Sequence, residues 1–210
     1  SVVFSHVFHR VPSYPAYILS GTVAWTFFAQ TTGAANRNIL WGSSLMKRIY
    51  LPRATLVVAI AGSNLINLAI TFIPLLLLVL VLGIRPGVTV SLLPLAVLCL
   101  LAFSLGVGLL LATVTTFFPD AAEFYQVLTG LWFYATPIIW PKDRLPPLVG
   151  TFLVSVNPMA DVIALFRSVF YTCDWPDPAS LIRAPLVSLL VLVLGWSVFT
   201  RHADTFIYRI

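Results

Sequence analysis

The chain has 210 residues, of which 60% are hydrophobic and 9% are charged. Because soluble domains carry about 25% charged residues, this composition excludes a soluble globular domain and predicts an integral membrane protein built as one domain, residues 1–210. The net charge of +5 is scattered along the chain without a basic run, which argues against nucleic acid as a partner.

Five apolar segments are long enough, or nearly long enough, to cross about 30 Å of hydrocarbon as helices. In chain order they are 17–35, 54–82, 88–118, 124–140 and 184–200, and none contains Asp, Glu, Lys, Arg or His. At ~1.5 Å per residue the second would reach ~43 Å. We therefore expect it to tilt, to bend at Pro74 or to project beyond the membrane.

The loop before the second segment, LMKRIYLPRATL, mixes basic and apolar residues. These residues are Met46, Lys47, Arg48, Ile49, Tyr50 and Arg53. Apolar anchors between charges suit docking into a groove on a partner protein. The same basic residues also fit the ordinary excess of Lys and Arg on the cytoplasmic side of a membrane. The sequence leaves both interpretations open.

A few polar and small residues lie inside the spans. Asn64 and Asn67 are one helical turn apart, so they share a face and could hydrogen-bond a neighbouring helix. Ser104 and Gly108 are four residues apart, a spacing that lets helices approach closely. We interpret all four as packing residues, with pore lining as the alternative.

The stretch LWFYATPIIWP places Trp132, Phe133 and Tyr134 side by side. An interfacial belt, in which Trp and Tyr anchor a helix end at the headgroups, explains Trp140 well. It explains three consecutive rings less well, because neighbours lie ~100° apart on a helix and cannot all face lipid. Trp25, Phe27 and Phe28 repeat the pattern in the first span. Since sugar rings stack on flat apolar platforms, inward-facing rings here suggest a carbohydrate path.

Residues 150–171 differ from the five spans. Asn157 is a plausible N-cap and Pro158 fits the first helical position. The helix that follows would be only ~20 Å long and contains Asp161 and Arg167. A short hairpin that dips into the membrane or lies on it fits better than a crossing; the alternative is an ordinary surface helix in a loop.

The sequence gives this chain no evident chemistry of its own. The three histidines, His6, His9 and His202, lie near the chain ends, and Cys99 and Cys173 have no motif partner. Coupling to a proton or ion gradient needs ionisable groups inside the membrane, which the five spans lack. Another subunit must therefore supply the energy for uphill transport. Counting basic residues leaves the orientation undecided, with six on each side.

Five stretches occur in an order and spacing that resemble a known family. They are PSYPAYILSGTVAWTFFAQ, LMKRIYLPRATL, LGVGLLLATVTTFFPD, TPIIWP and NPMADVIALFR. Together they resemble the membrane subunit of ABC-2 type exporters of polysaccharide, the group that handles lipid-linked O-antigen, capsule and teichoic acid chains. The resemblance covers nearly the whole chain and rests on the order of the stretches, because no single stretch is specific.

The resemblance implies an all-α, polytopic membrane helix bundle with a re-entrant helical hairpin. A full permease of this type has six spans, so we expect this chain to lack the first, with SVVFSHVF as that span's tail. It implies a multi-pass protein of the inner membrane with Ser1 outside and Ile210 inside. It also implies a second permease copy, a lipid-linked glycan as substrate and separate ATPase subunits that bind ATP and Mg. The permease would be non-enzymatic and would bind no cofactor or metal itself.

The resemblance also implies roles for three sets of residues. The element that docks on the ATPase would be Met46, Lys47, Arg48, Ile49, Tyr50 and Arg53. The aromatic residues near the glycan channel would be Trp25, Phe28, Trp132, Tyr134 and Trp140. The re-entrant gate would contain Asn157, Pro158, Asp161 and Arg167. One departure is that relatives tend to carry Arg-Asp where this chain has Pro119-Asp120, so any contact made by that Arg is missing here.

Two other functions remain open at this level. An ABC-2 permease for a drug or a lipid would have fewer interior rings and a more aliphatic lining. A membrane scaffold without a transport role would not co-purify with a nucleotide-binding subunit.

Overall fold

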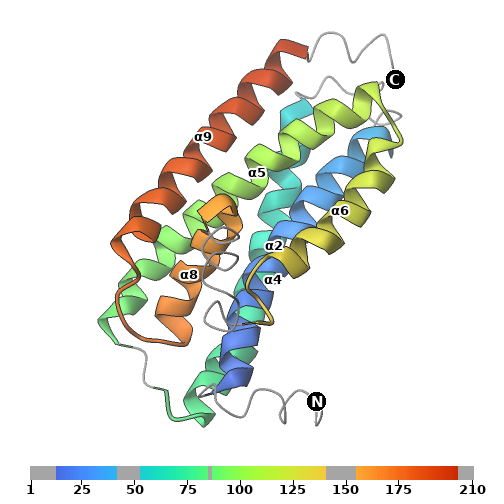
Figure 1. The fold of residues 1–210 in the computed structure, drawn as a ribbon. Helices are drawn as coiled ribbons and strands as arrows, with labels where there is room; N and C mark the ends of the chain where they lie inside the picture. Colours follow the sequence, from blue (N-terminus) through green and yellow to red (C-terminus); the bar gives the residue numbers. More distant parts are fainter. Residues whose placement is uncertain (1–12, 42–52, 85–86, 141–154, 203–210) are drawn as a thin grey trace.

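The computed structural model describes residues 13–41, 53–84, 87–140 and 155–202, and within these ranges it contains helices and turns but no strand (Figure 1). The helices are α2 (Tyr14–Trp41), α4 (Arg53–Val81), the 3-10 helix η1 (Val88–Leu92), α5 (Leu93–Phe117), α6 (Ala121–Ala135), α8 (Pro158–Phe170) and α9 (Pro178–His202). Figure 1 shows α9 running alongside α5, and α6 alongside α2. The predicted all-α bundle is therefore confirmed.

Within the described ranges, three helical segments are long and apolar enough to cross a membrane by length and composition. They are Ala54–Val81, Val88–Phe117 and Pro178–His202. Large aliphatic side chains such as Ile66 on α4 and Val193 on α9 point outward and are more than half exposed. An apolar exterior of this kind suits lipid better than water, and the chain is a multi-pass membrane protein.

The remaining two expected spans differ from the prediction. Helix α2 has 28 residues but is not among the three segments that are both long and apolar enough to cross a membrane, and α6 has only 15 residues. Helix α6 ends at Ala135, whereas the sequence pattern predicted a span to Trp140. The cause is Pro137, which disfavours a helical conformation in the residue before it. Thr136 is accordingly extended, with φ −92° and ψ 137°.

Helices α5 and α9 cross so closely that their backbones touch. A Cβ atom on Gly106 would lie 2.5 Å from the carbonyl carbon of Val191, and one on Gly195 would overlap the carbonyl oxygen of Gly106. Gly108 faces the other neighbour of α5, where a Cβ would lie 3.2 Å from that of Ala35 on α2. The small residues of α5 thus serve helix packing, as the spacing of Ser104 and Gly108 suggested.

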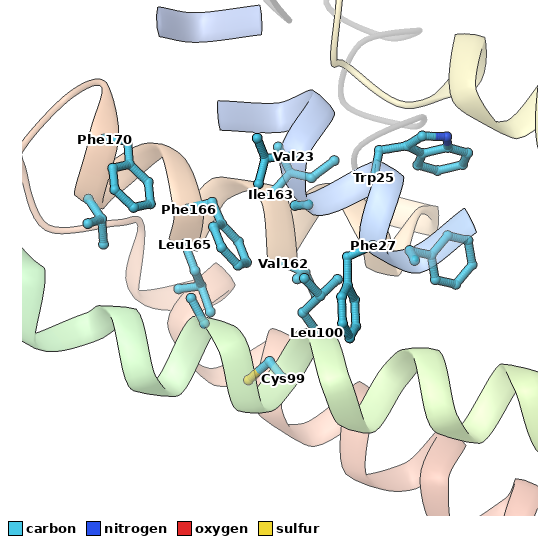
Figure 2. Close-up of a cluster of buried hydrophobic side chains, with 14 of the residues drawn as sticks. Val23, Trp25, Phe27, Cys99, Leu100, Val162, Ile163, Leu165, Phe166 and Phe170 are labelled. Atoms are coloured by element: carbon cyan, nitrogen blue, oxygen red, sulfur yellow. The ribbon is translucent and has the colours of Figure 1, made fainter. Parts of the chain in front are cut away.

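Helix α8 lies inside the bundle and forms much of its apolar core (Figure 2). Its side chains that are at most 2% exposed include Met159, Val162, Ile163, Leu165, Phe166 and Phe170. They contact α2, α5 and α9, and Phe72 of α4 packs on the Phe170 ring at 5.5 Å. The structure therefore excludes the alternative of an ordinary surface helix. Residues 141–154, which would contain the other limb of a hairpin, lie outside the described residues.

Candidate functional site

A groove of about 420 Å³ runs between α2 and α6. Its walls are helical stripes with a four-residue repeat, so each stripe stays on one face. From α2 the stripe is Trp25, Ala29, Gly33 and Arg37, joined by Asn36; from α6 two stripes contribute Ala122, Gln126, Gly130 and Tyr134, and Tyr125, Thr129 and Phe133. Small residues recur in both walls, and a Cβ atom on Gly130 would meet open space. The groove therefore forms where both helices carry glycine or alanine in place of a larger side chain.

The groove has an aromatic end and a polar end. Trp25, Phe133 and Tyr134 lie toward the start of α2 and the end of α6, whereas Asn36, Arg37 and Gln126 lie at the opposite end. Among its lining residues Arg37 is the one charged group, and aliphatic side chains larger than Ala are missing. Such a surface offers flat rings together with hydrogen-bonding groups, and it carries a single positive charge.

Polar contacts hold the C-terminal half of α2 to three neighbouring helices. The Tyr125 hydroxyl on α6 donates to Thr32 Oγ1 at 2.7 Å, and Asn64 Nδ2 on α4 donates to Thr31 Oγ1 at 3.0 Å. The Thr115 hydroxyl on α5 donates to the side-chain oxygen of Asn36. Asn64 therefore has the interhelical role expected from the sequence, whereas Asn67, its expected partner on the same face, is exposed.

A cluster of aromatic rings packs behind the aromatic end of the groove. Trp132 packs edge-on against Trp25, Phe28 and Phe103 at centroid distances of 6.0, 5.1 and 6.3 Å. Trp25 also contacts Phe133 at 5.6 Å. Phe28 is completely buried and does not line the groove, whereas Trp25 and Phe133 do. The consecutive rings of α6 thus divide, with Trp132 facing the bundle and Tyr134 outward at 67% exposure.

The segment after α6, residues 136–140, is non-helical, and its carbonyl groups need hydrogen bonds from elsewhere. Tyr17 donates to the carbonyls of Pro137 and Trp140 at 3.2 and 3.1 Å, and Tyr14 donates to that of Ile139 at 2.9 Å. These contacts attach the break in α6 to the start of α2. Tyrosines on α2 thus permit the irregular backbone of the TPIIW stretch.

Arg167 of α8 completes this set of donors. Its Nη2 donates to the carbonyls of Pro137 and Ile138 at 2.6 and 3.2 Å. The guanidinium lies 3.7 Å from the centre of the Tyr17 ring, a cation–π contact. Room for it exists because position 21 is glycine, whose Cβ would lie 3.1 Å from Nη2. Burial raises the pKa of the adjacent Tyr171 phenol, and the charge of Arg167 lowers it.

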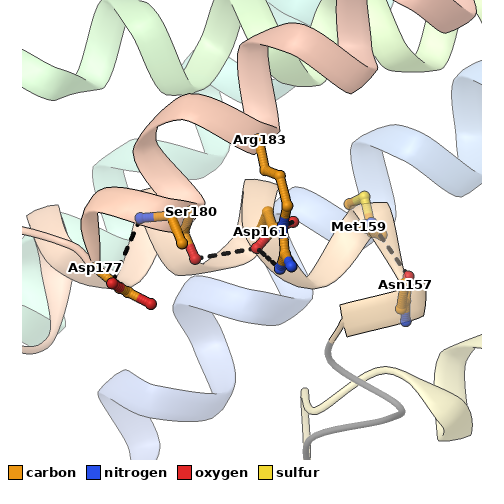
Figure 3. A network of polar contacts seen from close by, with 7 residues as sticks. Asn157, Met159, Asp161, Asp177, Ser180 and Arg183 are labelled. Atoms are coloured by element: carbon orange, nitrogen blue, oxygen red, sulfur yellow. Dashed lines mark hydrogen bonds and ion pairs between the residues drawn. The ribbon is translucent and has the colours of Figure 1, made fainter.

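Two further polar anchors fix α8 (Figure 3). Asn157 caps its N-terminus by accepting from the Met159 amide at 3.1 Å, as predicted for an N-cap residue. Asp161 accepts two bonds from Arg183 of α9, at 2.7 and 2.9 Å, and one from Ser180 at 3.0 Å. Asp161 is 3% exposed, so this ion pair neutralises a charge inside the protein.

The structure brings some of the sequence-predicted residues together and leaves others apart. Trp25 and Tyr134 line the groove, Phe28 and Trp132 support it, and Trp140 donates its indole proton to the Tyr134 carbonyl at 2.9 Å. The expected gate residues Asn157, Pro158, Asp161 and Arg167 all belong to α8 or its N-cap. Of the expected docking element, Arg53 begins α4; Met46, Lys47, Arg48, Ile49 and Tyr50 lie outside the described residues.

Sequence reasoning missed Tyr14, Tyr17 and Arg183 as partners of these segments. A signal was present, because a proline-broken segment within a membrane requires side-chain donors, and two tyrosines one turn apart begin the first helix. The partner of Asp161 was harder to find, since Arg183 is 22 residues away in another helix.

Comparison with known proteins adds two findings. The sequence profile of the family described as "ABC-2 type transporter" matches residues 1–171. A protein of Myxococcus xanthus called "O-antigen export system permease protein RfbA" is 26% identical over 198 residues, covering 94% of this chain and 76% of that protein. A Klebsiella pneumoniae protein of the same name is 23% identical over 195 residues, covering 91% of this chain and 74% of its own length.

Proposed function

The chain belongs to the ABC-2 type transporter family, and we propose that it is the permease subunit of an exporter that moves a lipid-linked polysaccharide across the inner membrane. Two relatives that align with most of the chain carry the name of O-antigen export permeases. We infer the class of substrate from the residues that line the groove between α2 and α6.

The groove lining favours a saccharide over a lipid or an apolar drug. Phe133 and Tyr134 present rings on which the apolar faces of sugars stack, and Gln126 and Thr129 offer donors and acceptors for sugar hydroxyls. Trp25 also lines the groove, but it is only 6% exposed and packs against Phe133. A lipid tail would be served better by Leu, Ile or Val, none of which lines the groove. A permease for a lipid or a drug was expected to have a more aliphatic lining, so the aromatic and polar lining supports a polysaccharide as the substrate.

ATP hydrolysis in a separate subunit drives the transport in this proposal. The apolar segments 17–35, 54–82, 88–118, 124–140 and 184–200 contain no ionisable Asp, Glu, Lys, Arg or His, so coupling to protons or ions lacks its usual groups. The segment from Met46 to Arg53 docks on the ATPase, which binds ATP and Mg. Two permease copies form the channel, and α8 belongs to a re-entrant gate on the outer side. This chain acts as a transport subunit without catalysis of its own.

The experiment that tests the substrate path compares two glycines in equally open surroundings. A Cβ atom at Gly130 or at Gly62 would meet no atom within 4 Å, but Gly130 lines the groove whereas Gly62 lies on the exposed face of α4. We expect Gly130→Leu to reduce glycan export at least tenfold, because its side chain fills the groove, and Gly62→Leu to leave export nearly unchanged.

Export of radiolabelled lipid-linked glycan into vesicles that contain both subunits measures this difference. ATP hydrolysis without glycan should persist in both variants, which separates blockage from misfolding. Equal export by the two variants would place the path elsewhere. Glycan-independent ATP hydrolysis in the unmodified complex, with no export at all, would contradict the proposed function itself.

A further inference from the structure

Asn157 makes more contacts than the capping of α8 requires. Its Oδ1 accepts from the Met159 amide at 3.1 Å, and it also accepts from Trp132 Nε1 of α6 at 3.0 Å. Its Nδ2 donates to Thr136 Oγ1 at 2.8 Å. The first bond belongs to α8 itself, whereas the other two join α8 to the end of α6. Asn157 is 8% exposed, so water competes little for these groups.

The orientation of the Asn157 amide is fixed by its partners. The Met159 amide and the Trp132 indole are donors only, so both require the oxygen and not the nitrogen of the side chain. The nitrogen then faces Thr136, whose hydroxyl donates onward to the Trp132 carbonyl at 2.7 Å. Asn157 therefore holds both the side chain of Trp132 and, through Thr136, its backbone.

Trp132 connects Asn157 to the wall of the groove. Its ring packs edge-on against Trp25 at 6.0 Å, and Trp25 contacts Phe133 at 5.6 Å. Trp25 and Phe133 form the aromatic end of the groove, whereas Trp132 stands behind them. The packed rings leave little freedom for a single one to rotate, because interiors of this density have few voids. A displacement of the Trp132 indole must therefore displace the wall of the groove.

From these contacts we infer that Asn157 is a positioning residue through which the N-terminus of α8 sets the aromatic wall of the α2–α6 groove. The contact path is Asn157, Trp132 and Trp25. The consequence for glycan binding rests on the proposed function, whereas the mechanical link does not. A residue that only capped α8 would be replaceable by any good cap.

Two substitutions separate capping from positioning. Serine is as good an N-cap as asparagine, but its shorter side chain does not reach the indole, so Asn157→Ser keeps the cap and loses the Trp132 bond. Trp132→Phe keeps Asn157 and its cap but removes the same bond from the other side. Ser180→Ala is the matched control, because it removes one hydrogen bond that joins α8 to α9 and leaves the contacts of Asn157 with α6 intact.

The indole N–H resonances of the ¹⁵N-labelled full chain in nanodiscs measure the link without any glycan. The signals of Trp25 and Trp132 are assigned with Trp25→Phe and Trp132→Phe. We expect Asn157→Ser to shift both signals and to remove the protection of the Trp132 indole proton from solvent exchange. Trp132→Phe should shift the Trp25 signal in the same direction, and Ser180→Ala should leave both signals in place. An unchanged Trp25 signal in both Asn157→Ser and Trp132→Phe overturns the inference.

A functional measurement extends the test to the complex with its ATPase. The glycan concentration that half-maximally stimulates ATP hydrolysis should rise several-fold in Asn157→Ser and should stay at the value of the unmodified complex in Ser180→Ala. Stimulation equal to that of the unmodified complex contradicts the inference. Failure of glycan to stimulate the unmodified complex counts against the proposed function, while the resonances still decide whether Asn157 sets the wall.

Discussion

Two helix pairs in this bundle use glycine for opposite purposes. Between α5 and α9, Gly106 and Gly195 remove side chains so that the two backbones come into contact. Between α2 and α6, Gly33 and Gly130 line a groove, where a Cβ atom on Gly130 would meet no atom within 4 Å and one on Gly33 would meet Arg37 Nη2 at 3.8 Å. The first pair is held by direct packing. The second is held by hydrogen bonds at its two ends, from Tyr17 and from Tyr125.

The comparison teaches that a small residue in a membrane helix does not by itself predict a close contact. Glycine permits helices to approach only where the facing surface is also smooth and where other contacts press the pair together. At the α2–α6 pair, bulky rings such as Trp25 and Phe133 act as spacers at one end. Substitutions should therefore affect the two pairs in different ways.

The largest effect is expected from alanine at the tight crossing. Gly195→Ala places a methyl group on the Gly106 carbonyl, so the helices must separate, and we expect the free energy of unfolding to fall by about 3 kcal/mol. Gly130→Ala adds the same methyl group to open space and should instead raise stability by up to about 1 kcal/mol, through better helix propensity. Thermal unfolding of the purified chain in detergent measures both. Similar losses in the two variants would remove the distinction between the pairs.

A smaller effect is expected where the start of α2 meets the end of α6. Tyr17→Phe keeps the ring beneath Arg167 but removes the donor to the Pro137 and Trp140 carbonyls. Since Arg167 still serves Pro137, the Trp140 carbonyl bears most of the loss, and we expect a cost of about 2 kcal/mol. The control Tyr14→Phe removes a donor from the Ile139 carbonyl alone, whereas Tyr17→Phe removes a donor shared by two carbonyls, one of them buried, so Tyr14→Phe should cost less. A larger loss in Tyr14→Phe would show that Tyr17 does not anchor the break.

The smallest effect is expected where the start of α6 meets the C-terminal half of α2. Tyr125→Phe keeps the ring in the groove wall and removes only the hydrogen bond to Thr32, a loss of about 1 kcal/mol. Thr32→Val combined with Tyr125→Phe should show a coupling energy of similar size in a double-mutant cycle of unfolding. Additive effects would mean that the bond does not hold α2 against α6.

Much of the architecture could be predicted from the sequence, because the hydrocarbon of a membrane requires long apolar segments whose backbone hydrogen bonds are satisfied within helices. Low charge and long apolar segments predicted an all-helical membrane protein, and the N-cap of α8 followed from the Asn157-Pro158 pair. The fourth span was predicted to end five residues too late, although Pro137 was visible. The apolar residues Ile138 and Ile139 continued the hydrophobic pattern while the backbone left the helix.

The candidate site was predictable in its residue types but less so in its arrangement. Clustered rings indicated a carbohydrate path, and Trp25 and Tyr134 do line the groove. Which of the consecutive rings faces inward depends on the rotation of α6 about its axis, and contacts with α2 and α8 determine that rotation. The pairings of Arg167 with Tyr17 and of Asp161 with Arg183 join helices far apart in the chain, so local patterns do not reveal them.

The sequence by itself determined that this chain is a helical membrane protein with long apolar segments free of charged residues, because the cost of burying polar groups in hydrocarbon acts on every residue independently of its neighbours. Only the tertiary structure decided which glycines close a contact and which open a groove, and which donors satisfy the broken end of α6. Those outcomes depend on the surface that faces each residue, and that surface exists only once the helices have packed.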